Sequence, residues 1–331
     1  MRLRLTMAIL VLASAARADP LAAPGYALTP VETNLAMPSG LALDGAALVA
    51  TDLATGRVVR IGAGGVAVDL TPPLPTGKDV MGEPTGPYKV RIVEGRAYVS
   101  QGWPDVDRGE GALDHAILAL GGSESAEPRI VGNDFWNPYD FERAGDDWFV
   151  ADAARNALVR IPAAGGPVEQ IFAFPRLKHR ETALKSLSPT EFKSDEIYEV
   201  DAVPTGVAVG GARVYVALFG GFPYIERGGV VVSVPVEGEE RRARLEVKDL
   251  NTPIDVAFAA DGRLLVLEMG VFDLDKGFLA GTGTLTAVDL ATGASEVLAS
   301  GLGLPVTVEP LPGGGAMVVQ MAGGIVRLSR S

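Results

Sequence analysis

The sequence predicts an all-β protein built as a single six-bladed β-propeller of four-stranded antiparallel blades. Three observations carry this prediction. A proline-led strand recurs six times, two further strands with alternating apolar residues follow each copy, and 41 glycines and 23 prolines interrupt the chain frequently. Short alternating strands separated by turn residues indicate antiparallel meanders, and repeats of about 50 residues are typical of propeller blades. The alternative, a β-sandwich, gives no reason for a proline-led strand to recur.

The first eighteen residues have the three parts of a secretory signal peptide. Met1 to Arg4 carries two positive charges, Leu5 to Ala16 is a largely apolar run of twelve residues, and Ala16-Arg17-Ala18 has the small residues that signal peptidase accepts. Twelve apolar residues are too few to cross roughly 30 Å of hydrocarbon. We therefore predict a signal peptide at 1–18, a propeller domain at 19–331, and a periplasmic or secreted protein.

Each repeat contains at least three strands. The inner strands begin 49, 51, 66, 49 and 52 residues apart, at Pro38, Pro87, Pro138, Pro204, Pro253 and Pro305. Second strands are predicted at 47–50, 96–100, 148–151, 214–217, 264–267 and 316–320. Third strands are predicted at 57–61, 116–120, 158–161, 230–234, 285–288 and 325–328. This order places every turn between first and second strands on one face of the propeller.

The two ends of the chain complete one blade. Only three strands remain after Pro305, so the last sheet lacks its outer member, and 26–35 reads as that missing strand. We expect Tyr26 to Leu35 to pair with Ile325 to Leu328. This pairing would close the ring and remove an edge that could aggregate.

Five long connections fall on the same predicted face, opposite the short hairpin turns. They are 72–86, 102–114, 175–203, 219–229 and 269–283. Long loops carried by a rigid scaffold are where binding sites concentrate. The longest contains 177–187, for which two readings stay open: two or three helical turns forming a lid, or a solvated surface loop.

Charged residues occur on the inner strands, at positions that converge on the propeller axis. Those on the strands are Lys89, Arg91, Asp140, Glu142, Asp255 and Glu309, and Asn137 precedes one of them. Four further polar residues, Asp52, Gln101, Asp152 and Glu268, stand at the exits of second strands and point toward the same mouth. Because a charge is costly to bury alone, these groups must pair or face a polar ligand. A structural ring of ion pairs, and turn capping by Asp52 and Asp152, are the alternatives to a ligand site.

Asp140 and Asp255 share one position, two residues after the repeat proline, where other repeats have Gly40 and Gly206. A carboxylate at a position that otherwise carries no side chain suggests that both project into the channel mouth. Two carboxylates there repel each other unless Lys89, Arg91 or a cation compensates. We expect these residues, with Asn137, to line the ligand or metal site.

Parts of the sequence resemble known propeller families. Val150-Ala-Asp-Ala-Ala-Arg-Asn-Ala-Leu-Val-Arg-Ile161 is similar to an NHL-type repeat, and 49–61 is a looser copy. Asn137-Pro-Tyr-Asp140, Asp201-Ala-Val-Pro-Thr-Gly-Val-Ala-Val209, Gly220-Gly-Phe-Pro223 and Ile254-Asp-Val-Ala-Phe258 resemble the ScyD/ScyE-type propellers, which are linked to the pigment scytonemin. This resemblance implies a secreted propeller of unassigned chemistry, and it supplies no catalytic residues.

Calcium is the one cofactor that the residues suggest. Asn137, Asp140, Asp255 and Glu309 would offer only oxygen ligands, which Ca²⁺ prefers. The set is similar, by ligand type and rough position, to the channel calcium of lactonase-type six-bladed propellers. No nucleophile elbow, zinc-protease motif, phosphate loop or dinucleotide fingerprint occurs.

Composition narrows the function classes. The absence of cysteine excludes disulfides and thiolate catalysis, two histidines exclude sites that need several imidazoles, and a net charge of -12 disfavours nucleic acid as a partner. We predict a monomer without a membrane span that binds a polar small molecule or a protein on its long-loop face through a charged channel, with no catalysis required. The alternative is a Ca²⁺-dependent hydrolase or lactonase with channel carboxylates holding the metal.

Overall fold

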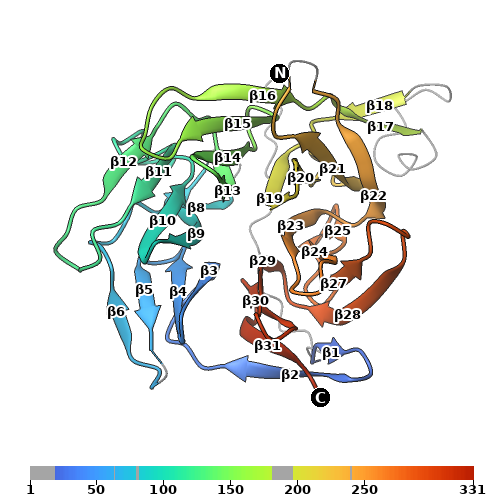
Figure 1. The fold of residues 1–331 in the computed structure, drawn as a ribbon, viewed down its shortest axis with the longest axis horizontal. Coiled ribbons are helices and arrows are strands. Elements are labelled where there is room, and N and C mark those ends of the chain that lie inside the picture. Colours follow the sequence, from blue (N-terminus) through green and yellow to red (C-terminus); the bar gives the residue numbers. More distant parts are fainter. Residues whose placement is uncertain (1–18, 63, 80–81, 181–196, 239–240) are drawn as a thin grey trace.

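The structure, a computed structural model, describes residues 19–62, 64–79, 82–180, 197–238 and 241–331. In these ranges the chain forms no helix, and six antiparallel sheets are arranged around one axis as the blades of a β-propeller, each with four strands except the fifth, to which a short additional strand is paired (Figure 1). The predicted fold class is therefore confirmed. None of the described residues belongs to a helix long and apolar enough to cross a membrane. The signal peptide predicted at 1–18 lies outside the described residues.

The strands of each blade follow one another from the axis outward. Blade one contains β3 (Pro38–Asp44), β4 (Ala47–Asp52), β5 (Val58–Ile61) and β6 (Ala67–Asp69). Blade two contains β9 (Pro87–Val93), β10 (Arg96–Gln101), β11 (Ala116–Ala119) and β12 (Arg129–Gly132). Blade three contains β13 (Pro138–Ala144), β14 (Asp147–Asp152), β15 (Ala157–Pro162) and β16 (Glu169–Ala173). Blade four contains β19 (Pro204–Gly210), β20 (Arg213–Leu218), β21 (Gly229–Pro235) and β22 (Arg244–Leu250). Blade five contains β23 (Pro253–Phe258), β24 (Leu264–Glu268), β27 (Gly283–Val288) and β28 (Ser295–Leu302). Blade six contains β29 (Pro305–Pro310), β30 (Ala316–Gln320) and β31 (Gly324–Arg330).

The N-terminal segment closes the ring, as predicted. Strand β2 (Tyr26–Val31) pairs antiparallel with β31, from Tyr26 opposite Arg330 to Val31 opposite Ile325. The strand ends at Val31, earlier than the predicted Leu35. The sequence did not predict β1 (Leu21–Ala22), which adds a fifth strand to blade five beside β28. The start of the described chain thus joins the last two blades.

Close packing of neighbouring inner strands explains the small residues near the axis. A Cβ on Gly40 of β3 would lie 2.7 Å from the carbonyl oxygen of Tyr88 on β9, and a Cβ on Gly206 of β19 would lie 2.6 Å from the Cα of Asp255 on β23. Farther out, large apolar side chains fill the space between blades. Trp148 is fully buried, with its ring 4.9 Å from that of Tyr98 on the preceding blade.

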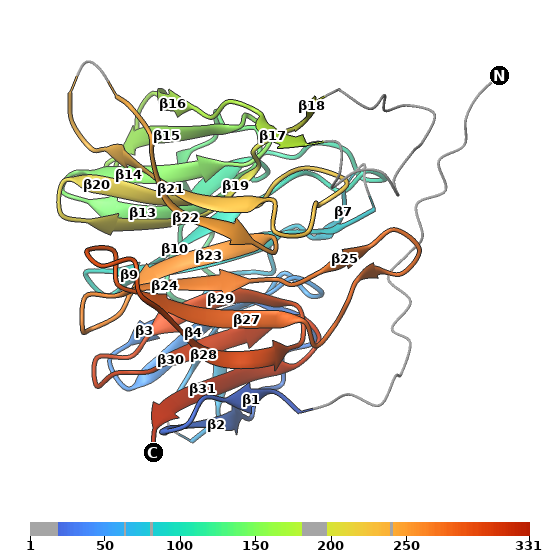
Figure 2. The same ribbon diagram turned by 90° about the vertical axis from the view of Figure 1, so that its right-hand side faces the viewer.

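The long connections gather on one side of the propeller, which we call the loop face; the opposite side, with the short turns, is the hairpin face. Three connections contain small antiparallel sheets, which Figure 2 shows projecting from the loop face. These are β7 (Gly77–Lys78) with β8 (Pro84–Thr85), β17 (Leu177–Arg180) with β18 (Ile197–Val200), and β25 (Phe272–Asp273) with β26 (Gly277–Phe278).

The helical lid considered for 177–187 is wrong for its first four residues. Leu177 to Arg180 form strand β17, in which Leu177 and His179 are half-buried while Lys178 and Arg180 are exposed. This alternation has the period of a strand rather than of a helix. The rest of the predicted segment lies outside the described residues.

Candidate functional site

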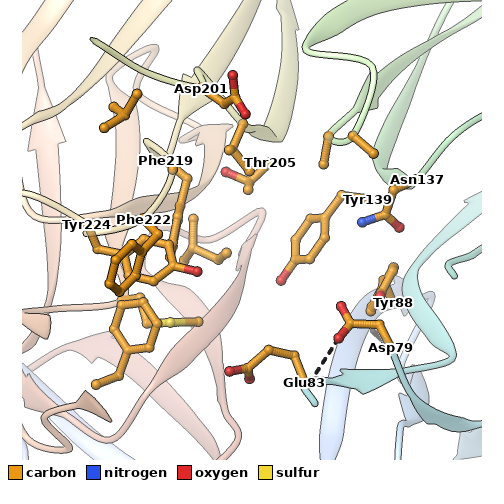
Figure 3. A pocket seen from close by; sticks show the side chains of 18 of the residues that line it. Asp79, Glu83, Tyr88, Asn137, Tyr139, Asp201, Thr205, Phe219, Phe222 and Tyr224 are labelled. Carbon is orange, nitrogen blue, oxygen red and sulfur yellow. Dashed lines mark hydrogen bonds between the residues drawn. The ribbon is translucent and has the colours of Figure 1, made fainter. Parts of the chain in front are cut away.

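A cavity of about 670 Å³ opens on the loop face at the end of the central channel (Figure 3). We call it the loop-face cavity. All five long connections contribute to its lining, for example through Glu83, Trp103, Asp201, Tyr224 and Phe278. Small-molecule sites usually occupy 300–1,000 Å³. The cavity is therefore large enough for a compact organic molecule.

A β-bulge at the start of every inner strand positions the inner lining of the cavity. The repeat proline pairs with the last residue of the second strand, and the register shifts just after it, as between Pro138 and Asp140. The same shift follows the other five prolines. Bulges redirect side chains. In five repeats the residue after the proline lines the cavity, namely Ser39, Tyr88, Tyr139, Thr205 and Ile254.

Two tyrosines from adjacent blades form a flat aromatic surface in the cavity. The rings of Tyr88 and Tyr139 are stacked, with centroids 4.9 Å apart and an interplanar angle of 27°. The Tyr88 hydroxyl donates a hydrogen bond to Thr85 Oγ1 at 3.1 Å, whereas the Tyr139 hydroxyl points into the cavity (Figure 3). Burial raises the pKa of both phenols, so both are neutral at physiological pH.

A second aromatic group lies across the cavity, on the fourth and fifth long connections. The Tyr224 ring lies 5.0 Å from that of Phe278 and 5.7 Å from that of Phe219. Phe222 contacts Tyr224 at a centroid distance of 6.0 Å. Burial, followed by the negative charges of Glu83 and Asp79, raises the pKa of Tyr224 to about 12. The cavity thus lies between two aromatic walls. The charges of Asp79 and Glu83 are close enough to raise the pKa of a tyrosine in each wall, Tyr88 and Tyr224.

Acidic residues outnumber basic ones around the cavity. Asp201 is paired with Arg176 at 3.0 Å, and Glu199 is paired with Lys178 at 3.1 Å. Asp79 Oδ1 accepts a hydrogen bond from the Glu83 backbone N–H at 3.0 Å. Burial and the neighbouring Asp79 raise the pKa of Glu83. Among the described residues, none forms an ion pair with the Glu83 carboxylate, which extends toward Tyr224 (Figure 3).

Of the eleven residues predicted for the site, Asn137 alone lies in the described lining of the cavity. Its Oδ1 is buried and has no hydrogen-bond partner in the described structure. The indole Nε1 of Trp103, another lining residue, is also buried without a hydrogen-bond partner in the described structure. Buried polar atoms are nearly always paired, so two orphaned atoms at one cavity indicate where a ligand could complete the hydrogen bonding.

The four residues at second-strand exits hold the connections between blades. Asp52 accepts hydrogen bonds from the backbone N–H groups of Ala36 and Met37 at 2.9 and 3.0 Å. Asp152 accepts from the N–H groups of Trp136 and Asn137 and pairs with Arg155 at 3.0 Å.

The other two exit residues make equivalent bonds. Gln101 Nε2 donates to the carbonyl oxygen of Pro75 at 2.8 Å, and Glu268 accepts from the Asn251 N–H and the Thr284 hydroxyl, both at 2.6 Å. Each of the four side chains therefore fixes the connection that enters its own blade. In the structure they position the walls of the cavity without lining it.

Lys89 crosses the propeller axis and closes the channel behind the cavity. Its Nζ lies 2.7 Å from Asp255 Oδ2 on the opposite blade and donates to the Val306 carbonyl and the Thr307 hydroxyl at 2.7 and 2.8 Å. Lys89 and Asp255 are each 1% exposed. Asp255 also accepts from the N–H groups of Val256 and Val308, both at 2.9 Å.

Asp140 occupies the equivalent position in blade three and is bonded in the same way. It accepts from the N–H of Phe141 on its own strand and from that of Val207 on the next blade, at 2.8 and 2.9 Å. Its charge is balanced by Arg91 at 2.8 Å. We expected Asp140 and Asp255 to project into the channel mouth; both are instead buried between inner strands, because the bulge directs the preceding residue to the mouth.

A second charged layer lies two residues farther along the inner strands, toward the hairpin face. Arg91 Nε pairs with Glu142 Oε2 at 2.9 Å, and Glu309 Oε1 accepts from the Leu43 N–H at 3.3 Å. Burial raises the pKa of Glu142, with Arg91 opposing the rise. Burial also raises the pKa of Glu309 to about 7, and the charge of Glu142 adds to this effect. A strand rises about 3.3 Å per residue, so this layer lies roughly 7 Å farther along the channel from the loop-face cavity than the layer of Asp140 and Asp255.

The predicted calcium ligands do not fit a Ca²⁺ ion in this arrangement. Both carboxylate oxygens of Asp140 and of Asp255 already accept hydrogen bonds from protein donors, and the Lys89 ammonium lies where a cation would be needed. Asn137 lines the cavity, whereas Glu309 belongs to the layer nearer the hairpin face. Within the described ranges, no three His, Asp or Glu side chains are grouped so as to hold a metal ion.

Sequence reasoning missed most of the cavity. The signal it could have used is the position directly after each repeat proline, because Tyr88 and Tyr139 stand there in neighbouring repeats. Glu83, Trp103 and Tyr224 lie in the connections that were predicted to form the elaborated face. No regular spacing distinguishes these three from other loop residues.

Comparison with known proteins supports the fold. No family model matches the chain, and no curated protein matches it. Among solved structures, a gluconolactonase from Xanthomonas campestris has a TM-score of 0.58 at 13% identity, over 90% of this chain and 87% of the other. Virginiamycin B lyase from Staphylococcus aureus has a TM-score of 0.56 at 12% identity, over 92% and 99%.

A PQQ-bound aldose sugar dehydrogenase from Streptomyces coelicolor has a TM-score of 0.54 at 15% identity, over 94% of this chain and 99% of the other. A lactonase, a lyase and a dehydrogenase thus share this scaffold, and propeller folds do not determine chemistry. At these identities the likeness shows one thing about the chain: it is a six-bladed β-propeller.

Proposed function

We propose that the protein binds a small organic molecule in the loop-face cavity. The observation that carries the proposal is the cavity of about 670 Å³ between two aromatic walls at the end of a closed channel. Apolar and aromatic walls with a few convergent polar groups are typical of small-molecule sites. The unpartnered Asn137 Oδ1 and Trp103 Nε1 offer one acceptor and one donor at its edge.

This proposal moves the ligand from the charged channel to the cavity at its mouth. Lys89, Arg91, Asp140, Asp255, Glu142 and Glu309 then act as the scaffold behind the site. The predicted leader at 1–18 would place the activity in the periplasm or outside the cell. Membership of the ScyD/ScyE-type family, suggested by the sequence motifs, belongs to the same proposal.

Two cofactor-dependent chemistries are less well supported by the residues present. The Ca²⁺-dependent hydrolase alternative lacks free oxygen ligands in the channel, as described above. PQQ, which one structural neighbour binds, is a quinone bearing carboxylates and needs cationic partners. Arg176 is the one basic residue in the described lining, and it is already paired with Asp201. We therefore derive no reaction step through either group.

A matched pair of tryptophan substitutions tests the proposal. Ala154 lines the cavity, so Ala154→Trp should fill part of it, while the exposed Ala164 lies in the turn after β15, at the hairpin face. The measurement is the thermal shift of each protein with a library of polar aromatic and amine-bearing metabolites, because a ligand that binds the folded state raises the melting temperature.

We expect at least one compound class to stabilise the wild type and the Ala164→Trp variant, and to lose its effect on Ala154→Trp. Equal shifts in all three proteins would place binding elsewhere and contradict the proposal. The absence of any stabilising compound would contradict it too. If a chelator abolished the shift, the calcium-dependent alternative would be favoured instead.

A further inference from the structure

The loop-face cavity carries an uncompensated negative charge on one side. Of the four acidic residues in its described lining, Asp201 and Glu199 are ion-paired with Arg176 and Lys178. Glu83 comes from the β7–β8 hairpin, close to Asp79, and no cation among the described residues forms an ion pair with the Glu83 carboxylate. The charge that remains at the cavity is therefore negative, in a protein whose net charge is already -12.

The two carboxylates lie between the aromatic walls. Their charges act on Tyr88 on one side and on Tyr224 on the other. Figure 3 shows the Glu83 side chain reaching into the cavity toward Tyr224 and Phe222, with Asp79 nearer Tyr88. A positive group held beside Glu83 would thus contact the faces of aromatic rings as well as a carboxylate.

This combination selects for cations by two independent effects. An organic ammonium is attracted by the negative face of an aromatic ring, and the attraction is stronger when the cation is partly desolvated. A carboxylate in the same cavity adds direct pairing, and the acidic protein raises the local concentration of cations while repelling anions. A neutral polar molecule, such as a sugar, could stack on Tyr88 and Tyr139 but would gain nothing from the unpaired charge.

We propose that the ligand of the loop-face cavity is an organic amine, bound as its ammonium with the positive group beside Glu83 and its apolar body between the Tyr139 and Tyr224 walls. This inference rests on the proposed small-molecule function and gives it a substrate class. It does not require the channel residues or a metal.

Three probes that share one body and differ in their head group test the inference. They are 2-phenylethylammonium, 2-phenylethanol and phenylacetate, which are cationic, neutral and anionic at pH 7.5. Isothermal titration calorimetry of the whole protein with each probe, up to millimolar concentrations, gives the order of affinity. We expect the cation to bind roughly tenfold more tightly than the neutral alcohol, and the anion to bind most weakly.

A charge-removing variant with a matched control locates the effect. Glu83→Gln should bring the affinity for 2-phenylethylammonium close to that for 2-phenylethanol while leaving the alcohol unchanged. Glu127→Gln removes one exposed charge in the connection before β12, at the hairpin face, and should change neither affinity. This comparison separates direct pairing at the cavity from the field of the whole protein.

Each contrary outcome has a distinct meaning. Tighter binding of the alcohol or of phenylacetate, or an unchanged cation preference in Glu83→Gln, would overturn the amine inference and leave the proposed small-molecule function standing. Binding of none of the three probes to the wild type would also overturn it. The proposed function itself would fail through the separate comparison of Ala154→Trp with Ala164→Trp.

Discussion

Replacing Lys89 by methionine is expected to lower the free energy of unfolding by about 3–5 kcal/mol, because it leaves a buried carboxylate without its charge partner. The Lys89 ammonium has three partners within 2.8 Å, and both it and Asp255 are almost completely buried. Methionine keeps most of the length of the side chain but offers no positive charge. Chemical denaturation with linear extrapolation measures the loss.

The pH dependence of this loss gives a second readout. Burial raises the pKa of Asp255, and Lys89 opposes the rise. Without Lys89 the folded-state pKa should rise further above the unfolded value, so the protonated form is favoured in the folded state. The destabilisation by Lys89→Met should therefore be smallest at low pH, grow as pH rises above the wild-type folded-state pKa of Asp255, and level off above the higher pKa of the variant.

Two companion variants make the Lys89 prediction specific. Lys248→Met removes a charge whose side chain is 72% exposed and should change stability by less than about 0.5 kcal/mol. Adding Asp255→Asn to Lys89→Met should recover part of the loss, since no buried charge is then left alone. An unfolding free energy for Lys89→Met within about 1 kcal/mol of the wild type, or strictly additive single losses, would contradict the role assigned to this pair.

Removing the ring-closing strand is expected to be comparably damaging. A chain that begins at Ala36 lacks β2, whose six residues pair with β31, and it also lacks the half-buried Tyr26 and Leu28, which pack against the core of blades five and six. Two such side chains stabilise by about 3 kcal/mol together, given 1.5–3 kcal/mol for full burial of one. The exposed edge of β31 should in addition promote association.

The matched control for this deletion is a chain that begins at Tyr26, which loses β1 but keeps β2. We expect it to unfold in one cooperative transition near that of the 19–331 chain. The Ala36 chain should unfold at a clearly lower denaturant concentration with a broadened transition. Superimposable transitions for the two shortened chains would mean that the pairing of β2 with β31 contributes nothing measurable to the free energy of unfolding.

The sequence predicted the scaffold well because the scaffold repeats. Six copies of one proline-led strand gave the inner strands from Pro38 to Pro305, and the missing outer strand of blade six pointed to β2. It was harder to predict which side chains of the inner strands face the cavity, because a bulge follows each proline. It turns Tyr88 and Tyr139 to the cavity and leaves Asp140 and Asp255 between strands, a shift that alternation alone does not reveal.

The cavity itself could be predicted only as a location. Loop lengths indicated the face, but Glu83, Trp103 and Tyr224 meet there through the folding of connections that have no repeat pattern. Most of the polar residues that the sequence singled out are instead bonded to other protein groups, whereas Asn137 Oδ1 and Gln101 Oε1 have no hydrogen-bond partner in the described structure. Asp52 and Asp152 accept hydrogen bonds from the connections, and Lys89 and Arg91 neutralise carboxylates. In the sequence, a charged residue at these positions was therefore as consistent with a buried structural role as with a binding site.

The most direct test of the central claim, that the loop-face cavity and not the charged channel binds the ligand, is a crystal structure of the wild-type protein saturated with 2-phenylethylammonium. The claim predicts the phenyl ring against Tyr139 or Tyr224, with the ammonium within hydrogen-bonding distance of Glu83 and with Lys89 still bonded to Asp255. A probe bound instead beside Arg91 and Glu309 at the hairpin end of the channel, or a cavity without the probe, would contradict it.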